Sequence, residues 1–166
     1  MLKANDYIEQ LELKPHPEGG FYRPSYNSNE RKDFLQGERV LYTSIYFLLR
    51  SEDVSHFHRL QSDELWYFHA GSPLTIHMIT PGGRYEEVTL GLQADKGEVL
   101  QFLVPEQTIF GSSVKKEDTF ALVGCMVSPG FDFDDFELFT QDELLFEYPE
   151  HEKVIRKLAY EQKPQS

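Results

Sequence analysis

The chain has 166 residues, a length typical of one domain. Hydrophobic residues make up 40% of it and aromatic residues 14%, which excludes a disordered chain and supplies material for a buried core. Its net charge of -12 disfavours binding to nucleic acid or to an anionic membrane surface, because both carry negative charge.

Cysteine content and hydropathy indicate in which cellular compartment the protein is expected. Cys125 is the single cysteine, so no intrachain disulfide can form. The longest apolar run, residues 45–49, is far shorter than the roughly 20 residues that span a bilayer. The first residues carry no signal-peptide pattern. These features lead us to expect a cytoplasmic protein.

The first predicted element is a short helix over residues 5–13. Tyr7, Ile8 and Leu11 recur at helical spacing, and the prolines at positions 15 and 17 end the helix. The turn-rich stretch 16–22 then leads into an aromatic strand. The polar stretch 27–37 is expected to be a loop.

A different pattern runs from about residue 40 to residue 127. Short apolar or alternating runs are separated by turn residues at intervals of about 8–12 residues, which is typical of a β-sandwich or barrel. We therefore predict an all-β core over residues 40–127. The predicted strands are 40–49, 54–58, 64–68, 74–79, 85–90, 99–104, 108–113 and 119–127.

The chain becomes acidic beyond Ser128. We interpret these carboxylates as a solvated face rather than a calcium site, because no glycine stands where a calcium loop needs its sharp turn. Thr140 and Glu143 have the spacing of a capping box, which predicts helices between residues 141 and 160. We find no internal repeat or linker and assign residues 1–166 to a single domain.

The stretch 56–71 carries the most informative chemistry. Residues two apart in a strand share a face, so His56 and His58 are expected to point the same way. Glu64, Trp66 and Phe68 share a face of the next strand. If both faces look inward, they form a pocket with imidazoles, a carboxylate and an aromatic floor. The alternative is surface histidines beside a core tryptophan.

This stretch resembles the first motif of the cupin superfamily, which contains two histidines, a glutamate and a glycine. Glu64 and Gly71 match its second half, whereas the gap between His58 and Glu64 is longer than in the motif. In the counterpart of the second motif, Gln107 replaces a glycine and Phe110 replaces the third metal-binding histidine.

Three further stretches narrow the resemblance, namely residues 16–20 (HPEGG), 62–66 (SDELW) and 129–137 (PGFDFDDFE). Together they resemble cupin family five, a family named as a domain of unknown function, over about residues 8–158. The resemblance implies a double-stranded β-helix, that is a jelly-roll barrel with short terminal helices. It also implies a homodimer and a fold similar to nucleotide-sugar 3,5-epimerases.

The first functional hypothesis is a metal-independent epimerase or isomerase acting on a sugar-like or carbonyl-containing small molecule. Histidine titrates near neutral pH, so His58 is the candidate base. Asp63 or Glu64 would orient its ring, and Tyr22 or Tyr46 would act as the acid. The remaining candidate ligand-binding residues are His16, Glu18, His56, Trp66, Phe68, Gln107 and Phe110.

Two alternatives stay open. A metal-dependent cupin would hold a divalent transition metal with His56, His58 and Glu64, a ligand set suited to iron or manganese. Phe110 disfavours this alternative because a phenyl ring cannot coordinate, so we expect no cofactor. The second alternative is a module that binds a small molecule without turnover, since binding and catalytic pockets use the same residue types.

Overall fold

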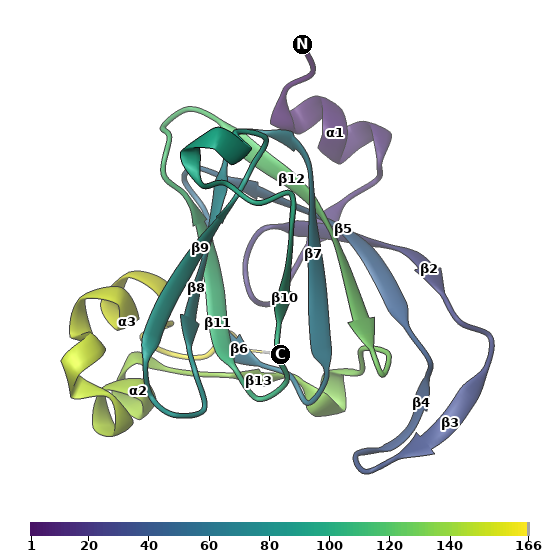
Figure 1. The fold of residues 1–166 in the computed structure, drawn as a ribbon, viewed down its shortest axis with the longest axis vertical. Helices are drawn as coiled ribbons and strands as arrows, with labels where there is room; N and C mark the ends of the chain where they lie inside the picture. Colours follow the sequence, from purple (N-terminus) through teal and green to yellow (C-terminus); the bar gives the residue numbers. More distant parts are fainter. Residues whose placement is uncertain (166) are drawn as a thin grey trace.

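Two facing β-sheets form the body of the computed structural model, which describes residues 1–165 (Figure 1). One sheet has the strand order β1 (Lys14–Pro15), β2 (Phe21–Asn27), β5 (Thr43–Arg50), β12 (Phe120–Ser128), β7 (Asp63–Gly71) and β10 (Gln101–Val104). The other has the order β13 (Glu137–Leu138), β6 (Val54–Arg59), β11 (Ile109–Val114), β8 (Leu74–Ile79) and β9 (Tyr85–Leu90).

The main core lies between the two sheets. Inward-pointing side chains of the two sheets meet there, and Trp66 of β7 packs against Phe110 of β11 with ring centroids 6.3 Å apart. Phe47 of β5 packs against the same indole at 6.0 Å. The predicted jelly-roll sandwich is therefore confirmed. No helix within residues 1–165 has the length and apolar character needed to cross a membrane.

All eight predicted strands occur, and β8 and β9 have the predicted bounds. The stretch 27–37, expected as a loop, instead contributes to a hairpin of β3 (Arg31–Phe34) and β4 (Gly37–Val40). Most of its side chains are exposed, so it lacks the apolar alternation that reveals a strand. Cross-strand contacts hold it, such as Arg31 Nε to Glu38 Oε2 at 3.0 Å. Figure 1 shows the hairpin projecting from the barrel.

Short helices lie at both ends of the chain. The helix expected over 5–13 is α1 (Ala4–Gln10), and the region 141–160 contains α2 (Gln141–Glu147) and α3 (Glu152–Leu158). The capping box at the start of α2 is present, because Thr140 Oγ1 accepts from Glu143 N and Glu143 Oε2 accepts from Thr140 N. A second core places α2 and α3 against the outer face of β6, which fixes the strand that carries His58.

Candidate functional site

The loop 16–20 places a carboxylate inside the barrel. Gly19 has φ of 108°, and a side chain there would collide with the carbonyl of Val54. This close approach lets the backbone N–H of His56 donate to the carbonyl of Glu18 at 2.6 Å. Glu18 is thereby held beside β6 with its side chain directed into the molecule, where it is only 7% exposed.

Glu18 forms a buried ion pair with His58. His58 Nε2 lies 2.8 Å from Glu18 Oε2, and the histidine is 3% exposed. Its Nδ1 lies 2.7 Å from the carbonyl oxygen of His56, which can only accept, so Nδ1 carries a proton. Both ring nitrogens of His58 are therefore engaged with the protein.

Burial and charge act in opposite directions on this pair. Burial alone would raise the pKa of Glu18, but the charge of His58 and the hydrogen bond from its ring bring it well below its usual value. Burial alone would lower the pKa of His58, but the Glu18 carboxylate raises it. Both shifts favour the charged form of the pair, a carboxylate with an imidazolium.

A second carboxyl group faces the same space. Glu64 is buried, and its Oε2 accepts a hydrogen bond from Trp66 Nε1 at 2.9 Å. Burial raises the pKa of Glu64 to about 7, and the nearby negative charge of Glu18 adds to the rise. At neutral pH Glu18 is therefore ionised, whereas Glu64 is partly protonated.

His16 supplies a neutral imidazole at the same place. Its Nδ1 accepts from the backbone N–H of Glu18 at 3.1 Å, so the proton of the neutral ring sits on Nε2. Burial lowers the pKa of His16, which favours this neutral form. The ring packs edge-on against Tyr22, with centroids 4.4 Å apart.

These side chains surround a small cavity of about 40 Å³ between the two sheets. Its lining residues are His16, Glu18, Tyr22, Thr43, Ile45, His58, Leu60, Glu64, Cys125, Val127 and Phe131. Burial raises the pKa of the Cys125 thiol well above its usual value, so this group is not a nucleophile at neutral pH. The cavity thus combines apolar walls with a few convergent polar groups.

Five of the residues singled out from the sequence meet in this cavity: His16, Glu18, Tyr22, His58 and Glu64. His56 does not, which corrects the expectation that it shares a face with His58. Its ring stacks on Tyr160, with centroids 3.5 Å apart. The cause is a β-bulge, because the pairing of β6 with β11 shifts between Phe110 and Ser112 and breaks the alternation of β6.

The other candidates lie around the cavity or outside it. Trp66, Phe68 and Phe110 belong to the core behind it, and the Phe110 ring packs on His58 at 4.2 Å. Asp63 is exposed and accepts from the backbone N–H of Glu106 at 2.8 Å, so it does not orient His58. Gln107 is exposed with φ of 64° and lines a groove on the outer surface.

Sequence reasoning assigned the orientation of His58 to the wrong carboxylate. The partner is Glu18, some forty positions upstream, and only the chain path brings the two together. Thr43, Ile45 and Leu60 were not anticipated in the cavity wall. Ile45 could have been found from the alternation of side chains along β5, because alternate residues share one face of a strand. In the structure Ile45 lies opposite Cys125, another cavity residue, in the pairing of β5 with β12.

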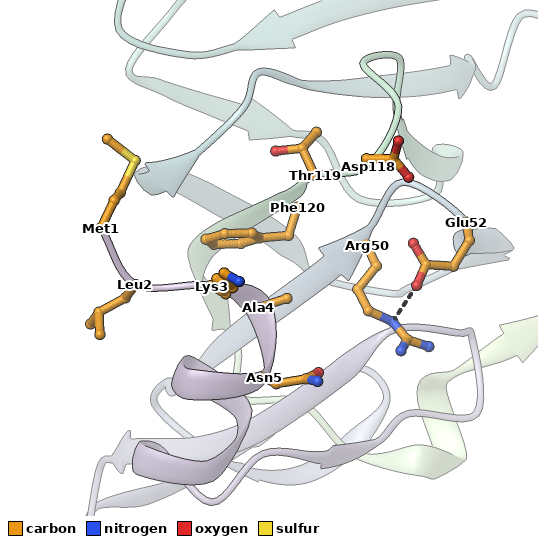
Figure 2. A pocket seen from close by; sticks show the side chains of 10 residues that line it. All are labelled: Met1, Leu2, Lys3, Ala4, Asn5, Arg50, Glu52, Asp118, Thr119 and Phe120. Atoms are coloured by element: carbon orange, nitrogen blue, oxygen red, sulfur yellow. Dashed lines mark ion pairs between the residues drawn. The ribbon is translucent and has the colours of Figure 1, made fainter.

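A larger hollow of about 650 Å³ lies elsewhere, between the N-terminal segment and the start of β12 (Figure 2). Arg50 in its wall is already paired with Glu52 at 3.3 Å and with Asp53 at 2.7 Å. Met1 and Leu2 are exposed at its rim. Because Arg50 is neutralised by these acidic partners, this hollow lacks the convergent buried groups of the cavity.

The match to known families agrees with this architecture. A family model described as "Cupin superfamily (DUF985)" matches residues 5–139. The chain belongs to the cupin superfamily. The family is cupin family five, so the resemblance drawn from the three short motifs is confirmed.

Solved structures resemble this cupin over nearly its whole length. A protein from Shewanella oneidensis is 56% identical, with a TM-score of 0.92, and the match covers 98% of this chain and 100% of that one. A hypothetical protein from Leishmania major is 44% identical, with a TM-score of 0.91 and coverage of 96% and 99%. No curated protein matches the chain.

A more distant likeness concerns the fold alone. Oxalate decarboxylase from Bacillus subtilis is 13% identical, with a TM-score of 0.57 over 93% of this cupin and 41% of the decarboxylase. The second sequence hypothesis supposed a metal held by His56, His58 and Glu64. Within residues 1–165, however, no three His, Cys, Asp or Glu side chains converge to hold an ion. His58 is engaged at both nitrogens and His56 stacks on Tyr160, so His56, His58 and Glu64 do not fit a metal.

Proposed function

We propose that this cupin binds a small carbonyl-containing molecule in the cavity and transfers protons on it without a metal, as an epimerase or isomerase. The observation that carries the proposal is the pair of carboxyl groups, Glu18 and Glu64, in one cavity with pKa values displaced in opposite directions. Such a divergence is a recurrent sign of acid–base roles in active sites.

Glu64 is the residue best suited to exchange a proton. A pKa of about 7 allows it to accept a proton next to a carbonyl and to return it at neutral pH. Trp66 occupies its Oε2, which leaves Oε1 for the ligand. His58, the base expected from the sequence, has both nitrogens engaged and so is proposed to act by holding Glu18 in its ionised form.

We propose that His16 and Tyr22 hold the carbonyl oxygen as hydrogen-bond donors. The Nε2–H of His16 is directed by the bond at its Nδ1, and Tyr22 lines the cavity beside it. Donors of this kind stabilise the negative charge that develops on the oxygen when a neighbouring proton leaves. In an epimerisation, Tyr22 would instead give its hydroxyl proton to the carbon on the face opposite to Glu64, Glu64 would keep the proton that it removed, and exchange with solvent would restore both groups.

Solvent hydrogen exchange tests this function across a panel of carbonyl compounds. Dihydroxyacetone, pyruvate and a set of aldoses and ketoses are incubated with the protein in D₂O, and loss of the α-proton signal is followed by NMR. We expect one or more compounds to exchange, and Glu64→Gln to slow that exchange by roughly 10²–10⁴-fold.

The matched control is Asp63→Asn, which changes the neighbouring exposed carboxylate outside the cavity and should exchange at the wild-type rate. A compound that shifts the NMR spectrum of the protein but never exchanges would identify a binding module instead of an enzyme. Exchange that survives Glu64→Gln would contradict the role of Glu64.

We also propose that this cupin forms a homodimer, as the family resemblance implied. Exposed apolar side chains on the β2 and hairpin side support it, namely Tyr26, Leu35 and Tyr42. Light scattering at micromolar concentration should give twice the chain mass of 19.4 kDa. Replacing Leu35 and Tyr26 by Lys should shift the mass towards the monomer, and a monomeric wild-type protein would rule the dimer out.

A further inference from the structure

One wall of the cavity is a short segment outside the sheets, residues 130–136, which we call the aromatic flap. Phe131 lines the cavity, and the Phe136 ring lies 5.3 Å from the His58 ring and 5.9 Å from the His16 ring. Phe133 packs on Phe131 at 4.9 Å and is about half exposed. The flap therefore separates the catalytic candidates from solvent.

Between its two ends the flap makes few hydrogen bonds to the body of the protein, and at its far end the chain continues into β13, which pairs with β6. The flap backbone bonds β4 and β5 only near its start, where Gly130 N donates to Val40 O at 2.8 Å and Phe131 N donates to Thr43 Oγ1 at 2.9 Å. The rest is a single 3₁₀ turn over Phe133–Asp135, closed by bonds within the flap. Local bonds of this kind persist when such a segment moves as a unit.

One side-chain contact ties the far end of the flap to the β3–β4 hairpin. Arg39 donates from Nε to Asp135 Oδ2 and from Nη2 to Asp135 Oδ1, both at 2.8 Å. Both side chains are largely buried, at 11% and 6% exposed. A shielded bidentate pair is among the stronger side-chain contacts and has a defined geometry, so it acts as a latch.

The small volume of the cavity also indicates that the flap moves. A cavity of about 40 Å³ holds little more than water, whereas organic ligands occupy sites of roughly 300–1,000 Å³. A groove of about 560 Å³ lies on the outer side of the flap, lined in part by Arg59, Gln107 and Phe136. Phe136 borders this groove and packs on His58, so its displacement would connect the groove to the cavity.

We infer that the aromatic flap is a gate, latched by Arg39 and Asp135, whose displacement into the outer groove admits ligand to the cavity. The wall formed by β5, β12 and β7 is a hydrogen-bonded sheet and cannot yield as easily. The inference uses the cavity of the proposed function, but it concerns access and not chemistry.

Cys125 provides a test that needs no ligand. It is the single cysteine, it is buried, and it lines the cavity, so its reaction with the thiol reagent methyl methanethiosulfonate reports opening of the site. Arg39→Gln and, from the other side of the latch, Asp135→Asn should each raise the labelling rate roughly tenfold, because each removes charge-assisted hydrogen bonds that hold the flap.

The matched control is Arg31→Gln, which removes an exposed pair with Glu38 in the same hairpin and should label at the wild-type rate. Urea unfolding of each variant gives its global unfolding constant. A labelling rate that stays at the wild-type value in both latch variants overturns the gate. A rate that rises only in proportion to global unfolding overturns it as well.

The two proposals fail in distinguishable ways. Unchanged labelling together with Glu64-dependent exchange would remove the gate and leave the proton-transfer function intact. Faster labelling in the latch variants, with no exchange of any compound, would leave the gate in place on a site of different chemistry.

Discussion

Glu64→Gln should make the protein more stable than the wild type at pH 8 and leave it nearly unchanged at pH 4. Burial raises the pKa of Glu64 from 4.5 to about 7, so between these values the folded state binds more proton than the unfolded state. Wild-type stability therefore falls as pH rises through this window. A displacement of this size corresponds to about 3 kcal/mol in the free energy of unfolding.

The amide of the variant cannot ionise, yet it still accepts the hydrogen bond from Trp66 Nε1. The variant should consequently lose the part of the pH dependence that Glu64 causes. Urea unfolding at pH 4 and pH 8 measures both values for each protein. Asp63→Asn again serves as the control, with the pH dependence of the wild type. If wild type and Glu64→Gln lose the same stability between the two pH values, Glu64 has an ordinary pKa, and this contradicts its proposed role in proton exchange.

His58→Gln should destabilise the fold by about 3–5 kcal/mol at pH 7, because it leaves the Glu18 carboxylate buried without its partner. Glu18→Gln should cost less, since His58 then loses its proton and becomes neutral. The double variant should regain much of the loss caused by His58→Gln, because no unpaired charge remains in the barrel.

Urea unfolding of the two single variants and the double variant at pH 7 gives the coupling free energy of the pair. Glu137→Gln is the matched control, since it breaks the more exposed pair with Arg59 and should cost less than about 1 kcal/mol. Additive losses would show that Glu18 and His58 are not a coupled ion pair, and would remove the basis for their protonation states.

The pair also sets how the protein responds to acid. The pKa of Glu18 is lowered on folding, so its contribution to stability is present above the usual value of 4.5 and is lost as pH falls below it. The pKa of His58 is raised, so its contribution is present below 6.5 and is lost as pH rises through the folded value. Together they favour a stability maximum between these two values, where both groups are charged.

The sequence alone determined the all-β fold and the family. Alternation and turn spacing between residues 40 and 127 reflect side chains that face the inside and outside of a sheet in turn, and this pattern is local. The sequence did not predict the hairpin β3–β4, because most of its side chains are exposed on both faces and its strands therefore lack the alternation of apolar and polar residues. Four residues of the cavity, His16, Glu18, His58 and Glu64, were also found from the sequence, because HPEGG and the cupin motif are short and contiguous.

Only the tertiary structure decided how those residues are used. A β-bulge in β6 turns His56 towards Tyr160, so that only His58 of these two histidines lines the cavity. The sequence of β6 does not reveal this shift in its pairing with β11. The partner of His58 is Glu18 because the loop 16–20 crosses β6, whereas Asp63, close in sequence, faces solvent. Alternation and motifs depend on neighbours along the chain, but the protonation of Glu18, His58 and Glu64 depends on burial and charges that meet only when distant segments pack together.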